Sequence, residues 1–162
     1  MIDFKKEDKN KIIEETKLKV KEYCFKGYHC SESAIRAITE ALQLRVSNDL
    51  IRSACGFRGG GGGYHDRCGV IEVGMMVISL IYGREDTSQE RWPYSYLIRI
   101  LHNRFREEFG SIYCRDILLP LKKTKKIHPC LSTYEKGCEI IIDVLFDSEN
   151  LLCNISEEEK NR

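Results

Sequence analysis

A run of five consecutive glycines constrains this chain more than any other feature of its sequence. The run consists of Gly59, Gly60, Gly61, Gly62 and Gly63. Glycines have no side chain to pack and reach backbone angles that other residues avoid, so such a run serves a special turn or a close approach of the backbone. It lacks the Gly-Lys-Ser/Thr ending and the preceding strand of a phosphate-binding loop. Cys68 follows directly before an apolar segment, so we expect the loop to position this thiol.

Apolar residues recur at helical spacing along most of the chain, and no alternating pattern of useful length appears, which predicts an all-α fold. The segment at about 69–83 is apolar on nearly every side and is expected to form a buried central helix after the glycine-rich loop. Residues 1–155 are predicted to form a single-domain helical bundle with four key cysteines, and residues 156–162 a frayed polar tail. The other expected helices lie at about 5–25, 30–44, 87–109 and 132–146, with short ones after Ser47 and Ser111.

The start of the helix that ends near Phe109 has two candidate signals. Residues 87–90, Thr-Ser-Gln-Glu, match a capping box. Pro93 is typical of a first helical turn and marks an alternative start.

Charge and hydropathy exclude several classes of protein. Lysine plus arginine number 26 and aspartate plus glutamate 25, so no net field favours nucleic acid or an anionic membrane. The N-terminal residues lack the apolar stretch of a secretory signal, and the longest apolar segment contains Glu72 and is too short to span a bilayer. We therefore expect a cytoplasmic protein without membrane insertion. The oligomeric state is left open, and a dimer is compatible with the sequence.

The chain has eight cysteines, which in an intracellular protein indicate metal, cluster or redox chemistry more than disulfides. Cys24, Cys138 and Cys153 lie in helical apolar patterns or near the end of the chain and are expected to pack as small hydrophobic residues. No Cys-x-x-Cys occurs, which disfavours a zinc ribbon, a thioredoxin-like pair and a bacterial ferredoxin run, and covalent haem is excluded for the same reason.

Four cysteines, Cys30, Cys68, Cys114 and Cys130, fall at the starts of predicted helices. The free N–H groups and the positive end of the dipole at a helix start stabilise a thiolate and any anionic cluster that it holds. Soft thiolates select zinc, cuprous copper or iron–sulfur clusters. The spacing of the four residues does not decide whether they share one site.

At these four cysteines the sequence resembles a family of redox-active proteins named for a C…GCAxxG…C…C pattern. The resemblance lies in Gly-Tyr-His-Cys-Ser-Glu-Ser-Ala at 27–34, Gly-Phe-Arg-Gly-Gly-Gly at 56–61, Cys68-Gly69, Tyr82-Gly83, Phe-Gly-Ser-Ile-Tyr-Cys-Arg-Asp-Ile-Leu at 109–118, and Cys130. It implies a small helical protein in which four cysteines serve redox chemistry or cluster binding, without a defined substrate. A similar domain occurs in a haem-carrying cytochrome of split-Soret type. Val70 and Val73 stand where the family has alanine and glycine, and Gly74 comes one place later, which predicts altered helix packing beside the site.

Several residues near the four cysteines are candidates for auxiliary roles. Cys55 is a candidate extra ligand or resolving thiol, and His29 and His65 are candidate ligands or proton carriers, with solvated loop histidines as the alternative. Glu72 in the apolar helix needs a partner such as Arg67, Arg58 or Arg115, or else carries protons beside the site. Gly69 is expected to help position the site, and lysines at 122–126 to dock an acidic electron-transfer partner or simply to be solvated.

Three hypotheses for function follow. The leading one is an electron-transfer protein that binds an iron–sulfur cluster or another thiophilic metal through Cys30, Cys68, Cys114 and Cys130. The second is a metal-free thiol–disulfide or peroxide-reactive enzyme, with a low-pKa thiolate at Cys68 and Cys55 or Cys30 as the resolving thiol. The third is a helical adaptor whose cysteines only pack.

Overall fold

The structure, a computed structural model, describes residues 4, 7–123 and 127–162. Throughout these residues the regular structure is helical, so the all-α prediction is confirmed. The helices are α1 (Lys9–Phe25), α2 (Cys30–Ala41), α3 (Asn48–Ser53), the 3-10 helix η1 (Ala54–Phe57), α4 (Gly69–Tyr82), α5 (Trp92–Phe109), α6 (Cys114–Lys122), α7 (Leu131–Cys153) and α8 (Glu157–Lys160).

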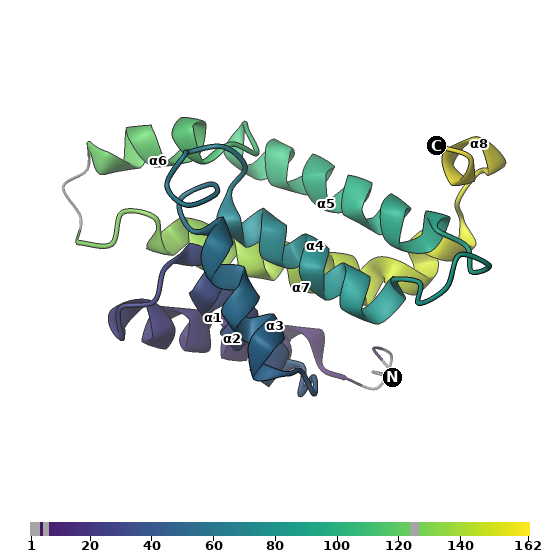
Figure 1. The fold of residues 1–162 in the computed structure, drawn as a ribbon, viewed down its shortest axis with the longest axis horizontal. Helices are drawn as coiled ribbons and strands as arrows, with labels where there is room; N and C mark the ends of the chain where they lie inside the picture. Colours follow the sequence, from purple (N-terminus) through teal and green to yellow (C-terminus); the bar gives the residue numbers. More distant parts are fainter. Residues whose placement is uncertain (1–3, 5–6, 124–126) are drawn as a thin grey trace.

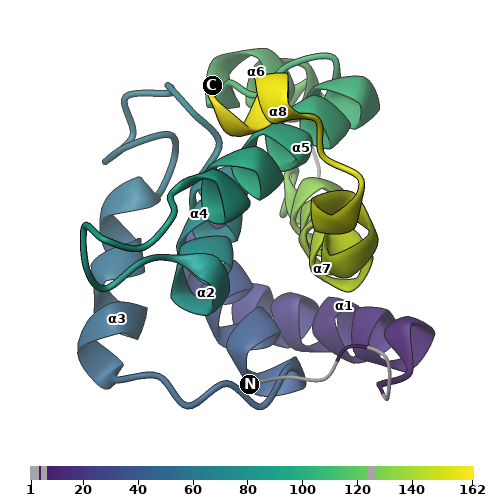
Figure 2. The same ribbon diagram turned by 90° about the vertical axis from the view of Figure 1, so that its right-hand side faces the viewer.

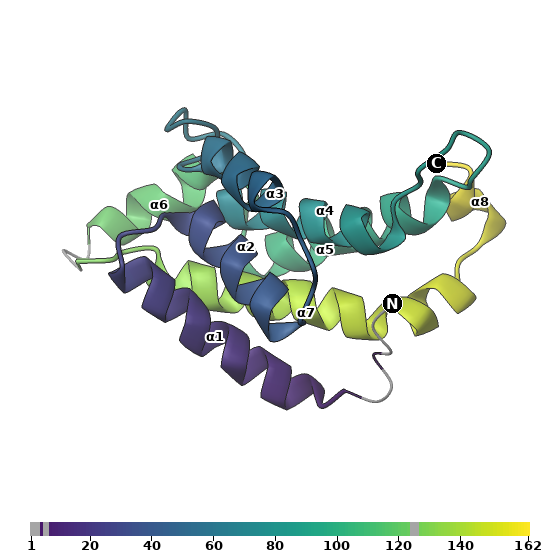
Figure 3. The ribbon, with the colours of Figure 1, turned by 60° about the horizontal axis from the view of Figure 1, so that its bottom comes forward.

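Helix α4 lies at the centre of the bundle, as its apolar sequence predicts. It packs against α2, α5 and α7, while α1 covers α2 and α7 on the opposite side (Figures 1 and 2). Val70, Ile71 and Val77 on α4 are fully buried, together with Ile141 on α7. The glycine-rich loop, α6 and the start of α7 gather at one end of the bundle, and α8 lies at the other (Figure 3).

Two glycines allow the central helices to approach closely. A Cβ atom on Gly74 would lie 2.6 Å from Cδ2 of Leu101 on α5 and 2.9 Å from Cγ1 of Ile141 on α7. A Cβ atom on Gly137 of α7 would lie 2.7 Å from Cγ1 of Val70 on α4. The three helices therefore meet where side chains are absent, which fits the dense packing of protein interiors.

The boundaries of three helices were tested by the structure. Helix α5 begins at Trp92 with Pro93 in its first turn, so the predicted start at Pro93 is confirmed and the one at the capping-box pattern of residues 87–90 is wrong. There Gln89 closes a loop instead, because its Oε1 accepts hydrogen bonds from the backbone N–H groups of Glu85 at 2.7 Å and Asp86 at 3.2 Å. Helix α2 ends at Ala41 rather than near residue 44, and α7 continues to Cys153 rather than ending near residue 146. The predicted start of the first helix at residues 5–6 lies outside the described residues.

Residues 156–162, the predicted polar tail, include the short helix α8. Ser156 caps α8 by accepting a hydrogen bond from the N–H of Glu159 at 3.3 Å. The guanidinium of Arg99 on α5 donates to the backbone carbonyl of Glu159 at 2.7 Å and to its carboxylate at 3.0 Å. These contacts attach the tail to α5. Among the described helices, none has both the length and the apolar character that a membrane span requires.

Replacing Gly74 with alanine is expected to lower the free energy of unfolding by about 1–2 kcal/mol. The added methyl group collides with Leu101 and Ile141, and the gain in helix propensity offsets only part of that cost. Gly56 is the matched control, because a Cβ atom there has no neighbour within 4 Å. Urea unfolding followed by circular dichroism measures both variants, and equal effects would contradict the packing argument.

Candidate functional site

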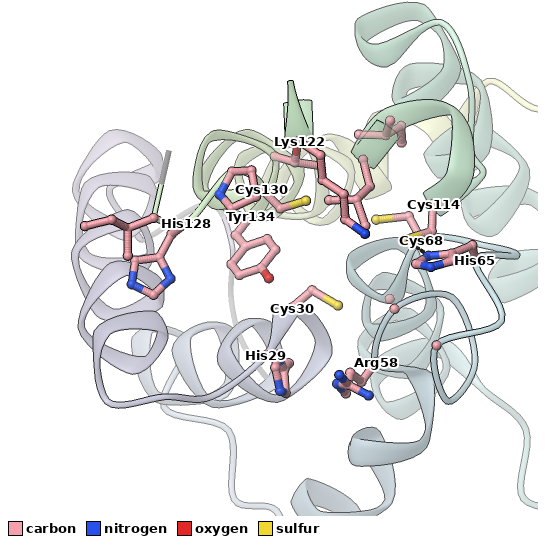
Figure 4. A pocket seen from close by; sticks show the side chains of 18 residues that line it. His29, Cys30, Arg58, His65, Cys68, Cys114, Lys122, His128, Cys130 and Tyr134 are labelled. Atoms are coloured by element: carbon pink, nitrogen blue, oxygen red, sulfur yellow. Dashed lines mark hydrogen bonds between the residues drawn. The ribbon is translucent and has the colours of Figure 1, made fainter. Parts of the chain in front are cut away.

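The four cysteines at helix starts line a single cavity. It has a volume of about 500 Å³ and lies between the starts of α2, α4 and α7, the glycine-rich loop and α6. Figure 4 shows the thiols of Cys30, Cys68, Cys114 and Cys130 around the cavity, each on a different element. Residues that are separated by as many as 100 positions in the sequence thus face the same space.

Each of these cysteines lies at the first turn of its helix. Cys30 and Cys114 are the first residues of α2 and α6, and Cys68 and Cys130 are the N-cap residues of α4 and α7. Backbone N–H groups at a helix start have no partner within the helix, so they are available to groups in front of it. Four helices therefore direct their positive ends toward the cavity.

The glycine run is a tightly wound loop. All five glycines have positive φ angles, between 59° and 92°, and His65 follows with φ of 64°. Backbone hydrogen bonds close the loop, from Gly62 N to Gly56 O at 2.9 Å and from His65 N to Gly59 O at 2.9 Å. Residues with a Cβ atom rarely adopt this left-handed backbone, which explains why the sequence requires glycine at these positions.

The segment after the loop pairs with the segment before α6. Cys114 N donates to Asp66 O at 2.6 Å, and Cys68 N donates to Ile112 O at 2.9 Å. Arg67 and Tyr113 form an isolated antiparallel bridge between these bonds. The backbone therefore holds Cys68 beside Cys114.

Gly69 brings the thiol of Cys30 to the same place. A Cβ atom on Gly69 would lie 2.9 Å from Sγ of Cys30 and 2.7 Å from the carbonyl oxygen of Phe57. Any larger residue would displace one of these neighbours. The absence of a side chain at Gly69 lets α2 and α4 start against each other.

The auxiliary candidates are in different environments. Nδ1 of His65 lies 3.6 Å from Sγ of Cys114, and His29 lines the cavity in front of α2. Glu72 does not line the cavity and pairs with Arg67 at 3.5 Å. Burial raises the pKa of the Glu72 carboxyl group, although the Arg67 charge opposes this shift.

The structure places Cys55 outside the cavity and Lys122 of the lysine-rich segment in its wall. Cys55 is exposed, does not line the cavity, and donates its S–H to the carboxylate of Glu32 at 3.3 Å. Lys122 ends α6 and lines the cavity, whereas Lys123 is exposed outside it. Residues 124–126, the rest of the predicted basic loop, lie outside the described residues.

Sequence reasoning did not assign several polar residues of the cavity wall to the site, namely Arg58, Lys122, His128, Thr133 and Tyr134. Tyr134 lies one helical turn after Cys130 on α7, and this spacing places both side chains on the same face. Lys122 lies two turns after Cys114 on α6, which is a similar signal. Arg58 directly precedes the glycine run and gives no comparable pattern.

Burial favours the protonated form of three cavity thiols, Cys68, Cys114 and Cys130. It raises the pKa values of Cys68 and Cys130 to about 12, and the neighbouring thiols add to this shift. Hydrogen bonds from the N–H groups of Val70 and Ile71 lower the pKa of Cys68, but burial outweighs them. The pKa of Cys114 is raised for the same main reason. The low-pKa thiolate that the second hypothesis places at Cys68 is therefore wrong for the metal-free protein.

The thiols do not form a ready site for one ion. Within the part of the chain that the structure describes, no three His, Cys, Asp or Glu side chains are arranged to hold a single metal ion. A tetrahedral zinc site, with ligands about 2.0–2.3 Å from the metal, thus requires side chains to move.

Comparison with protein families agrees with the cysteine pattern. Residues 28–144 match the model of the family described as "Putative redox-active protein (C_GCAxxG_C_C)". The chain belongs to this family. Its four cysteines at helix starts all lie within the matched segment, and the family description supports a redox role. No curated protein and no solved structure matches the chain. The relation to the split-Soret cytochrome domain stays a prediction.

Alanine at Gly60 is expected to disturb the cavity much more than alanine at Gly61. Both residues have positive φ angles, so both variants carry similar backbone strain of about 1 kcal/mol. Only at Gly60 does the new Cβ meet backbone, 2.5 Å from Asp66 N, while at Gly61 nothing lies within 4 Å. Alkylation of Cys68, followed by peptide mass spectrometry, should accelerate in Gly60→Ala only, and equal rates would refute this role of the loop.

The free energy of unfolding of the reduced, metal-free protein is expected to fall between pH 9 and pH 12. The raised pKa of Cys68, about 12 against 9.0 for an ordinary thiol, stabilises the folded state below pH 9, and this contribution is lost as the pH rises through 12. The predicted slope is about 1.4 kcal/mol per pH unit for this one proton. The free energy of unfolding, measured by urea titration at each pH, should depend less steeply on pH in Cys68→Ser, by about that amount. An unchanged slope would show that the thiol already ionises near its ordinary pKa.

Proposed function

We propose that the protein is an electron-transfer protein that binds an iron–sulfur cluster through Cys30, Cys68, Cys114 and Cys130. The observation that carries this proposal is the shared cavity, into which four helix starts direct one cysteine each. Membership of a redox-active family supports the same conclusion.

The residues of the cavity fit such a cluster. All four donors are sulfur, the ligand that iron–sulfur clusters prefer. A cluster spreads its ligands over several iron atoms, so its thiolates lie further apart than the ligands of one ion. The absence of a three-ligand site for a single ion among the described side chains therefore favours a cluster over one zinc or cuprous ion.

The protein's own residues would serve the cluster in distinct ways. A bound cluster supplies one-electron chemistry. The N–H groups of Val70 and Ile71 act on the Cys68 sulfur, and Lys122 adds positive charge near Cys114 and Cys130. His65 orients the thiol of Cys114. Because burial favours the neutral thiols of Cys68, Cys114 and Cys130 in the metal-free protein, loading releases protons and becomes tighter as the pH rises.

The other two hypotheses have less support. Thiol–disulfide chemistry needs a reactive thiolate, whereas burial raises the pKa of Cys68. Of the two candidate resolving thiols, Cys30 lines the cavity with Cys68 and Cys55 lies outside it. Structural packing describes Cys138 and Cys24, which are 0% and 3% exposed in the core. It does not account for four thiols around an open cavity.

Anaerobic purification, followed by assays for iron and acid-labile sulfide, tests the proposal. We expect both elements in the wild-type protein, and their loss when Cys30, Cys68, Cys114 and Cys130 are replaced together by serine. The matched control is Cys55→Ser with Cys153→Ser, because both residues are exposed and outside the cavity.

The control variant should keep the wild-type iron content, and circular dichroism should show that both variants remain helical. The proposal fails if the wild-type protein binds no iron after anaerobic incubation with iron and sulfide. It also fails if the quadruple variant binds as much iron as the control.

A further inference from the structure

The charge of the cavity wall has one sign. Arg58 and Lys122 line it, together with His29, His65 and His128, and no Asp or Glu is among the lining residues that the structure describes. Figure 4 shows the ammonium group of Lys122 close to Cys114 and Arg58 across from it, near His29. A cleft with one sign of charge concentrates ions of the opposite sign.

The two cations have no counter-ion in the described part of the protein, where neither Arg58 nor Lys122 forms an ion pair. The carboxylates next to the cavity are engaged elsewhere. Glu32 accepts hydrogen bonds from the N–H of His29 at 3.1 Å and from Cys55 at 3.3 Å. Asp66 lies 3.7 Å from the guanidinium of Arg115. The positive charge of the wall is thus available to an anion.

The cavity also has the size and the apolar surface of a small-molecule site. Its volume of about 500 Å³ lies within the range of about 300–1,000 Å³ that is typical of ligand pockets, and is larger than a metal ion needs. Ile117 and Leu118 of α6 and Pro129 provide apolar wall, and the hydroxyl group of Tyr134 points inward (Figure 4). A ligand here would lie beside the four thiols.

We propose that the cavity binds a small organic anion, whose charged group pairs with Arg58 and Lys122 and whose apolar part lies against Ile117 and Leu118. The anion rests on the proposed function only in that it shares the cavity with the cysteines that hold the cluster. Binding of the anion itself requires only the cations and the walls, so it is measurable in the metal-free protein.

Two thiol reagents of opposite charge test the inference. 2-Sulfonatoethyl methanethiosulfonate is a small organic anion, and its 2-(trimethylammonium)ethyl analogue is a cation of similar size. In reduced, metal-free protein, the anion-to-cation rate ratio at Cys30, Cys68, Cys114 and Cys130 should exceed the ratio at exposed Cys153 by roughly tenfold. Peptide mass spectrometry resolves each cysteine. Because both reagents react with the thiolate, the thiolate fraction of each cysteine cancels in the ratio of the two rates.

Matched variants connect the effect to the two cations. Arg58→Gln with Lys122→Gln should bring the ratio down to that of Cys153. Arg45→Gln with Lys123→Gln removes the same charge from exposed residues outside the cavity, and should leave the ratio unchanged. The inference is overturned if the wild-type ratio equals that of Cys153, or if both double variants change it equally.

A competition experiment examines binding directly. Benzoate should slow modification of the cavity cysteines in a saturable way, while benzamide, its neutral isostere, should not, and neither should protect Cys153. Protection by both compounds or by neither overturns the inference. Iron and sulfide analysis is independent of these rates, so failure of the cluster proposal and failure of anion binding are distinguishable.

Discussion

The start of α4 is the constraint on which the cavity depends. Cys68 must lie between the start of α2 and the segment before α6, and three backbone features make this position possible. The left-handed glycine loop turns the chain within a few residues. The hydrogen bond from Cys114 N to Asp66 O joins the loop to α6, and the bare Cα of Gly69 leaves room for the Cys30 thiol. Backbone geometry therefore places three of the four thiols.

Opposing effects act on the thiols within this geometry. Helix starts and the Lys122 ammonium favour the thiolate form, whereas burial and neighbouring sulfurs favour the neutral thiol. Burial has the larger effect in the metal-free protein. Buried thiols that favour the neutral form suit a site that would release protons when it binds a metal. They are poorly suited to nucleophilic chemistry, which requires the thiolate.

The sequence was sufficient to predict the fold class and the four helix starts. The bounds of α4 were predictable because its apolar run is flanked by Cys68 at one end and Gly83 at the other. The end of α7 was missed because Ser148 is fixed by a tertiary hydrogen bond to the Tyr82 hydroxyl group, which no local pattern reveals. That the four cysteines face one cavity could not be derived from their spacing, since it depends on long-range backbone pairing. Lys122 was grouped with its neighbouring lysines at 123, 125 and 126, which were expected either to dock an acidic partner or to be solvated, so its place in the cavity wall was not predicted.

The four cysteines of the cavity belong to four helix starts spread over residues 30–130, and no two of them are near neighbours in the sequence. An unfolded chain therefore offers no closely spaced Cys-x-x-Cys pair to chelate a metal ion. Ligands that bind only the folded state contribute their full binding free energy to its stability. Folding must bring Cys130 into place before all four thiols face the cavity, so binding of the proposed cluster through all four would be a late event that reports a completed fold.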